Sequence, residues 1–120
     1  TVIETVLSEL NLTTCGIACH FQLNMLIRDP SLLNGTECKY VMNSATHVDF
    51  LIYNKIRKAP VLAIEVDGYS FHKEDSVQAE RDKMKNHILD LYEIPYLRLS
   101  TTGSHEKEKL TTKLKEILGI

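Results

Sequence analysis

The sequence predicts one mixed α/β domain whose central sheet of about four strands is flanked by helices, in the order α-β-β-β-α-β-α. Three observations support this fold class. Apolar residues recur at helical spacing in separate segments, β-branched and aromatic residues gather in short runs between them, and no repeat or linker divides the chain. With 120 residues, the chain is long enough for one compact domain and short for two.

The first part of the chain is expected to form a helix and then a strand. The helix ends near Asn11 and is indicated by apolar residues at helical spacing, namely Val2, Ile3, Val6, Leu7 and Leu10. Strict alternation then predicts a strand within residues 18–27, through Phe21, Leu23, Met25 and Ile27. The pair Asp29-Pro30 ends this strand, and residues 31–45 fit either a short helix or an irregular excursion.

Two adjacent strands are predicted in the middle of the chain. Residues 47–54 and 60–66 are rich in β-branched and aromatic side chains, and the polar segment 55–59 joins them. A helix follows over about 75–92, with a predicted apolar face of Val77, Met84, Ile88 and Leu91.

A strand and a helix are predicted to complete the domain. The strand lies within residues 94–100 and is introduced by Pro95, which cannot continue the preceding helix. Ser104 is the predicted cap of the last helix, whose inward-facing residues are Leu110, Leu114, Ile117 and Leu118.

Composition narrows the classes of function. The chain is 43% hydrophobic and 25% charged, which is typical of an ordinary soluble domain. Its formal net charge of −2 argues against a strong free-standing nucleic-acid binder, but leaves open a domain delivered to nucleic acid by a larger partner. No apolar run approaches the roughly 20 residues that cross a bilayer, so no membrane partner is expected. The chain opens on Thr1 rather than Met, so we expect residues 1–120 to be a domain excised from a longer protein.

The cysteines indicate the cellular compartment. Cys15, Cys19 and Cys38 make an odd number without a C-x-x-C pair, which favours a reducing compartment, expected to be the cytoplasm. Together with His20 they offer an alternative, a zinc site. Their spacing matches none of the usual closed zinc sites, and cysteine is commonly buried as a small hydrophobe.

Three acids interrupt the two central strands. Because side chains alternate along a strand, a turn centred near Arg57 places Asp49 directly opposite Glu65, with Cβ atoms roughly 5 Å apart. Facing carboxylates repel, and a hard divalent cation between them removes the conflict. Asp67 shares the face of Glu65. The inference depends on this register, and the alternative is that the acids lie at strand ends in water.

The next helix carries a polar stripe that would approach these acids. Gln78, Asp82 and Lys85 lie at i, i+4 and i+7, opposite Met84 and Ile88. If the helix packs beside the two strands, a lysine and a glutamine point toward the carboxylates. A solvated helix face is the alternative.

The acid and helix motifs together resemble those of the PD-(D/E)XK, or restriction-endonuclease-like, superfamily. The matching strings, within residues 47–99, are Asp49-Phe50, Glu65-Val66-Asp67-Gly68, His72, Arg81-Asp82-x-x-Lys85 and the segment IPYLRL. The pattern is more narrowly similar to the branch related to very-short-patch-repair endonucleases. That branch includes small nuclease-like domains at the C-terminal ends of superfamily 1 helicases.

The resemblance implies a restriction-endonuclease-like fold and metal-dependent hydrolysis of DNA, in a repair or helicase protein whose parent chain carries helicase domains. Asp49, Glu65 and the main-chain carbonyl of Val66 would hold Mg²⁺ or Mn²⁺, and the metal would activate a water. The motif lysine two residues after Glu65 is replaced by Asp67, which would be a further ligand or would mark weakened catalysis.

Other matched residues receive supporting roles from the resemblance. Lys85 would replace the missing lysine, whereas Lys83 points elsewhere around the helix and is expected in solvent. His72 would assist proton transfer or serve as a hydrogen-bonded loop residue. Accessory positions are Glu4, Gln78 and Arg98, the last either on the nucleic-acid backbone or in a structural ion pair.

Two other functions stay open at this point. One is a catalytically inactive nuclease-like module that binds DNA or a protein partner, which the charge and the missing lysine favour. The other is a small metal-binding α/β enzyme of another hydrolase class.

Overall fold

The structure is a computed structural model, and it describes residues 1–67, 77–100 and 105–120. Its centre is a four-stranded mixed sheet in the order β1-β2-β3-β4. The strands are β1 (Cys15–Gln22), β2 (His47–Asn54), β3 (Ala59–Asp67) and β4 (Tyr96–Ser100). The first three pair antiparallel, and β4 pairs parallel with β3. The predicted α/β class with about four strands is confirmed.

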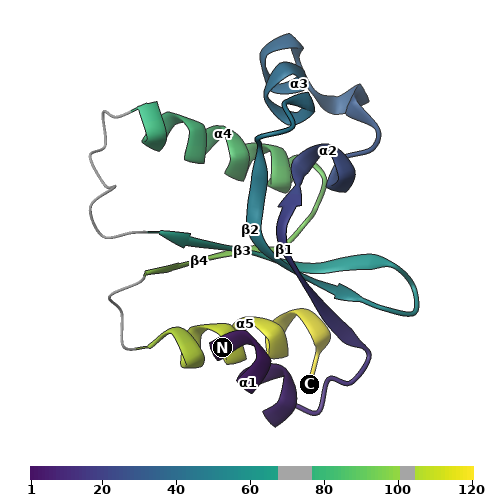
Figure 1. The fold of residues 1–120 in the computed structure, drawn as a ribbon, viewed down its shortest axis with the longest axis vertical. Coiled ribbons are helices and arrows are strands. Elements are labelled where there is room, and N and C mark those ends of the chain that lie inside the picture. The colour runs from purple at the N-terminus through teal and green to yellow at the C-terminus, as the bar shows by residue number, and fades with distance from the viewer. Residues whose placement is uncertain (68–76, 101–104) are drawn as a thin grey trace.

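Helices cover both faces of the sheet (Figure 1). On one face lie α1 (Val2–Glu9) and α5 (Glu106–Leu118), which bury apolar residues such as Val6 and Leu110 against Ile52 and Ile64. On the other face lie α4 (Val77–Leu91) and the short helices α2 (Leu23–Leu26) and α3 (Gly35–Met42). No described helix is long and apolar enough to span a bilayer.

The predicted strand over residues 18–27 is wrong at both ends. β1 begins at Cys15 and ends at Gln22, and the chain then turns into α2. Leu23 and Ile27 are both buried, whereas Met25 between them is 52% exposed. A spacing of four residues joins one helix face, while a strand would have buried Met25 as well. Packing of this helical face against the core therefore decided the conformation.

The ambiguous segment 31–45 is largely helical. A 3₁₀ turn, η1 (Pro30–Leu32), precedes α3, whose start is a capping box. The Asn34 side chain accepts the Glu37 N–H at 2.8 Å, and the Glu37 carboxylate accepts the Asn34 N–H at 2.9 Å. Such reciprocal bonds satisfy two of the backbone donors that a helix start leaves unpaired.

Two predicted details at the helices need correction. Ile88 of α4 is buried as expected, but Val77 and Leu91 are exposed and Leu89 enters the core instead. The position before α5 is His105, which makes no side-chain capping bond. Ser104, the predicted cap, lies outside the described residues.

The register of β2 against β3 agrees with the sequence prediction. Phe50 pairs with Ile64 and Leu51 with Ala63, and continuing this ladder brings Asp49 opposite Glu65. The register shifts between Ile52 and Tyr53, nearer the turn. The two pairs next to the turn, Asn54–Ala59 and Tyr53–Pro60, are therefore one residue out of the predicted register. The ladder takes the predicted register from Ile52 onward, so both acids face the side of the sheet on which α4 packs.

Candidate active site

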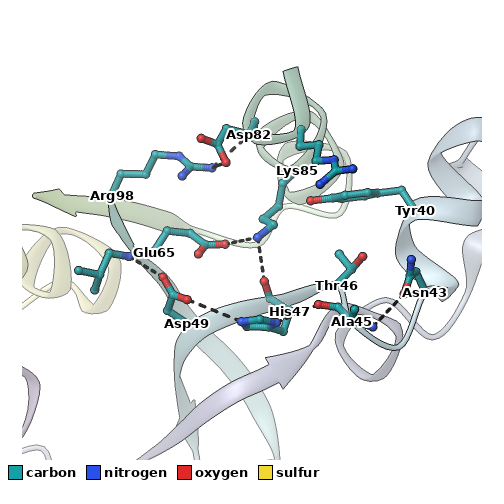
Figure 2. A pocket seen from close by; sticks show the side chains of 12 residues that line it. Tyr40, Asn43, Ala45, Thr46, His47, Asp49, Glu65, Asp82, Lys85 and Arg98 are labelled. Carbon is teal, nitrogen blue, oxygen red and sulfur yellow. Dashed lines mark hydrogen bonds and ion pairs between the residues drawn. The ribbon is translucent and has the colours of Figure 1, made fainter. Parts of the chain in front are cut away.

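A cavity of about 430 Å³ opens on the α4 face of the sheet, and the two facing acids line it. Its walls come from α3, the loop before β2, the strands β2, β3 and β4, and α4. Figure 2 shows Glu65, Asp49 and Lys85 pointing toward one another within it. Segments far apart in the sequence therefore supply a single polar cavity.

Glu65 and Lys85 form the central contact of the cavity. The Lys85 Nζ donates to Glu65 Oε1 at 2.6 Å and to the His47 main-chain carbonyl at 2.8 Å. Strand alternation puts Glu65 on the same face as buried Ala63, and Lys85 lies one helical turn before buried Ile88. The two charged side chains are only 7% and 12% exposed, so this is a largely buried ion pair.

Opposing influences act on the Glu65 carboxyl. Burial raises the pKa of Glu65 above its ordinary value, the hydrogen bond and charge of Lys85 lower it, and the neighbouring Asp49 carboxylate raises it again. The net direction is upward. A second cation in the cavity would favour the ionised form of Glu65 further.

Asp49 completes the acidic part of the cavity. Its Oδ2 accepts the Val66 N–H at 2.8 Å, and its Oδ1 lies 3.8 Å from Nε2 of His47 (Figure 2). Carboxylate oxygens from adjacent strands are the donors that hard cations such as Mg²⁺ prefer. The Asp49 carboxylate raises the pKa of Glu65, and a cation between the two acids would relieve this repulsion. The donor set therefore fits the metal implied by the sequence motifs.

Arg98 joins β4 to α4 beside this cavity. Its guanidinium donates to the Asn86 side-chain carbonyl at 2.9 and 3.2 Å and lies 3.7 Å from the Asp82 carboxylate. Asp82 and Asn86 flank Lys85 on the helix. Arg98 therefore has a structural contact that holds the segment carrying Lys85, which is one of its two predicted roles.

Tyr40 of α3 is half-buried and adds a phenol to the cavity wall. Burial, followed by the negative charges of Glu65 and Asp82, raises the pKa of Tyr40 to about 12, although Arg81 and Arg98 oppose the shift. The phenol is therefore neutral across the physiological range and can act as a hydrogen-bond donor or acceptor.

The remaining predicted residues are not gathered at the cavity in the same way. Glu4 lies in α1 on the opposite side of the sheet, where it closes a capping box with Thr1. His72 lies outside the described residues, and so do the side chains of Asp67 and Gln78. Val66 lines the cavity, and its described contact there is the N–H bond to Asp49.

Several cavity residues were not singled out from the sequence. His47 precedes Asp49 by two residues on β2, so strand alternation alone would have placed it on the same face. Tyr40 carries no such signal because α3 lies in a segment of ambiguous pattern. In the loop before β2, the Ala45 N–H donates to Asn43 Oδ1 at 2.9 Å.

Comparison with known proteins gives a family. A family model described as "Protein of unknown function (DUF2726)" matches residues 6–117. Searches of curated proteins and of solved structures returned no match.

Proposed function

Because the chain belongs to the DUF2726 family, whose description leaves the function open, we propose an activity from the site itself: Mg²⁺- or Mn²⁺-dependent hydrolysis of phosphodiester bonds in DNA. The observation that carries the proposal is the buried Glu65–Lys85 contact beside Asp49 within one cavity. The resemblance of these motifs to PD-(D/E)XK nucleases supports it. The proposal includes a restriction-endonuclease-like fold for the domain.

The proposed chemistry depends on two acids that bind the cation and one lysine that neutralises charge. Asp49 and Glu65, with the Val66 carbonyl and Asp67 as further ligands, would hold the cation. When bound, the cation supplies Lewis-acid stabilisation of phosphate charge and a more acidic water. Lys85 neutralises charge from the opposite wall of the cavity.

Lys85 is well placed to act on a phosphate oxygen. An ammonium has three donors, and the contacts recorded within the described residues engage two of them. The bond to the His47 carbonyl fixes the direction of the side chain before substrate arrives. A donor that is already oriented needs no reorganisation when negative charge develops.

Residues around the pair position it or assist it. Arg98 would be a positioning residue, because it holds Asp82 and Asn86 on either side of Lys85. His72 would assist proton transfer. The proposed context is a DNA repair or helicase protein in which helicase domains deliver DNA to this weakly acidic domain. The cysteine usage supports a cytoplasmic location.

A non-catalytic module is the second candidate, and one contact favours it. Lys85 bonds both a side chain on β3 and the main chain at the start of β2, which is also the pattern of a structural tie between helix and sheet. In that case the cavity would bind nucleic acid or a partner without cleaving it.

The test is cleavage of supercoiled and short linear DNA by the 120-residue chain at low salt. We expect nicking with Mg²⁺ or Mn²⁺ that chelation abolishes, and a loss of about 100-fold or more in Asp49→Asn. Lys85→Arg, which retains the charge and is the safer variant for folding, should lower the rate because its planar group cannot repeat both bonds. Lys83→Arg on the exposed side of α4 is the matched control and should stay within about twofold. Absence of cleavage, or cleavage unchanged in Asp49→Asn, would overturn the proposal.

A further inference from the structure

A second group of side chains with metal-ligating atoms shares Asp49 with the acid pair. His20, His47 and Asp49 each offer one ligand atom, and these atoms all lie within 4.8 Å of one another. We propose that the three residues bind a transition-metal ion that accepts imidazole ligands, with Zn²⁺ as the representative ion. The proposal concerns metal binding and does not depend on the proposed DNA hydrolysis.

The sheet brings the three side chains together. His20 lies between the paired positions Cys19–Phe50 and Phe21–Val48, which puts it opposite Asp49 across β1 and β2. His47 precedes Asp49 by two residues on β2, so the two share a face. All three residues therefore lie on two neighbouring hydrogen-bonded strands.

The conformation of His20 is unusual for a strand residue. Its φ of 49° lies in the left-handed region, which residues with a side chain rarely adopt. The imidazoles of His20 and His47 also approach closely, with ring centroids 5.0 Å apart and the rings inclined at 71°. Backbone outliers of this kind gather at functional sites, and here the outlier is itself a candidate ligand.

The hydrogen bond on His47 leaves a lone pair facing the carboxylate. Its Nδ1 lies 3.0 Å from the Ala45 carbonyl, which can only accept, so Nδ1 carries the proton. In the neutral ring Nε2 is then an acceptor, and it lies 3.8 Å from Asp49 Oδ1, another acceptor. A cation between the two atoms turns this unfavourable contact into two bonds. A backbone carbonyl on the opposite ring nitrogen is also the usual support of a metal-ligating histidine.

The donor set selects the class of ion. Two imidazoles and one carboxylate suit Zn²⁺ and related transition metals, with a fourth position open to solvent, whereas Mg²⁺ prefers oxygen alone. Ligand atoms around tetrahedral zinc lie about 3.4 Å apart, as follows from bonds of about 2.0–2.1 Å. The side chains of His47 and Asp49 are 38% and 29% exposed, which leaves room for the small rotations that close the group around an ion. No cysteine belongs to this group, so it differs from the cysteine-based zinc site considered from the sequence.

The experiment is a titration of the metal-free 120-residue chain with Zn²⁺ by calorimetry and with Co²⁺ by absorption, without nucleic acid. We expect one saturable site whose affinity falls about tenfold or more in His20→Ala and in His47→Ala. Two control variants should bind Zn²⁺ with an affinity within about twofold of that of the original chain. His105→Ala removes an exposed imidazole that precedes α5, and Cys19→Ser removes the exposed thiol next to His20.

A second measurement uses the original chain and so does not depend on the folding of any variant. In the original chain, Zn²⁺ should shift the imidazole resonances of His20 and His47 together and leave that of His105 in place. Absence of saturable binding, an affinity unchanged in His20→Ala, or an affinity lost in Cys19→Ser would overturn the proposal. Because this binding is measured without DNA and cleavage is measured with Mg²⁺, the two proposals can fail separately.

Discussion

Replacing Lys85 by methionine tests how the buried ion pair contributes to the fold. The substitution keeps the unbranched stem in α4 and removes the ammonium that bonds Glu65 at 2.6 Å and the His47 carbonyl at 2.8 Å. Removing one partner of a buried pair costs about 3–5 kcal/mol, because the other charge stays buried and unpaired. With both side chains at 12% exposure or less, we expect a loss of about 3 kcal/mol in the free energy of unfolding at about pH 8.

The loss should depend on pH in a defined direction. The folded-state pKa of Glu65 is raised above its value in the unfolded chain. Between these two values the folded protein binds a proton that the unfolded chain has released, so stability falls as the pH rises through that window. Lys85 lowers the pKa of Glu65, and its removal moves the upper limit of the window to higher pH. The variant therefore loses more stability at high pH than the original chain does.

Urea denaturation at about pH 5 and about pH 8 measures the effect. At the lower pH a larger share of Glu65 in the variant is protonated than at the higher pH, because its pKa is raised, and the expected loss shrinks toward about 1.5 kcal/mol, the value of one hydrogen bond from a charged group. Lys83→Met, exposed on the same helix, should change stability by no more than about 0.5 kcal/mol at either pH. Combining Lys85→Met with Glu65→Leu should recover most of the loss. Equal losses at both pH values would refute the reasoning.

Four further substitutions test other parts of the structure, each by urea denaturation. In Gly16→Ala the added Cβ would lie 2.7 Å from the Tyr53 ring, so we expect the free energy of unfolding to fall by about 1–3 kcal/mol. In Gly35→Ala the added Cβ meets nothing within 4 Å, so this variant should be as stable as the original chain or more stable. Similar losses in both variants would contradict the packing argument. Asn34→Ala removes the cap of α3 and should cost about 1 kcal/mol, and an unchanged midpoint would show that the cap contributes nothing. Asp49→Asn keeps an oxygen that can accept the Val66 N–H, so its unfolding free energy should change by less than about 1 kcal/mol. A larger change would assign Asp49 a role in folding in addition to its proposed role in cleavage.

The central acids could be predicted from the sequence because the relevant rules are local. Alternation has a period of two, and an assumed turn centre near Arg57 faced Asp49 with Glu65. The structure reaches that pairing through the register shift between Ile52 and Tyr53, which the sequence pattern did not predict. The side of α4 that bears Lys85 was predicted less accurately. The polar stripe was placed opposite Ile88, whereas Lys85 lies three residues before this buried residue and on the same side of the helix. Each of these inferences spans only one element or one turn. The catalytic roles of these residues stay predictions.

The other parts of the fold and site depend on distant contacts. The spacing of Leu23 and Ile27 fits both a strand and a helix, and only the core on which they pack decides between the two. The position of His20 opposite Asp49 depends on the pairing of β1 with β2. Because α2 and α3 separate these strands in the sequence, no local pattern predicts that they pair. The left-handed conformation of His20 has no sequence signal of its own.

The pairing of β4 with β3 has a consequence for the order in which the chain folds. The acids of β2 and β3 meet through a local hairpin, whereas Lys85 arrives on a crossover helix that Arg98 of β4 holds in place. Local pairings form before distant ones because less chain entropy is lost. We therefore expect Asp49 and Glu65 to face each other before the ammonium docks. A divalent cation that reduces their repulsion should then speed refolding at neutral pH.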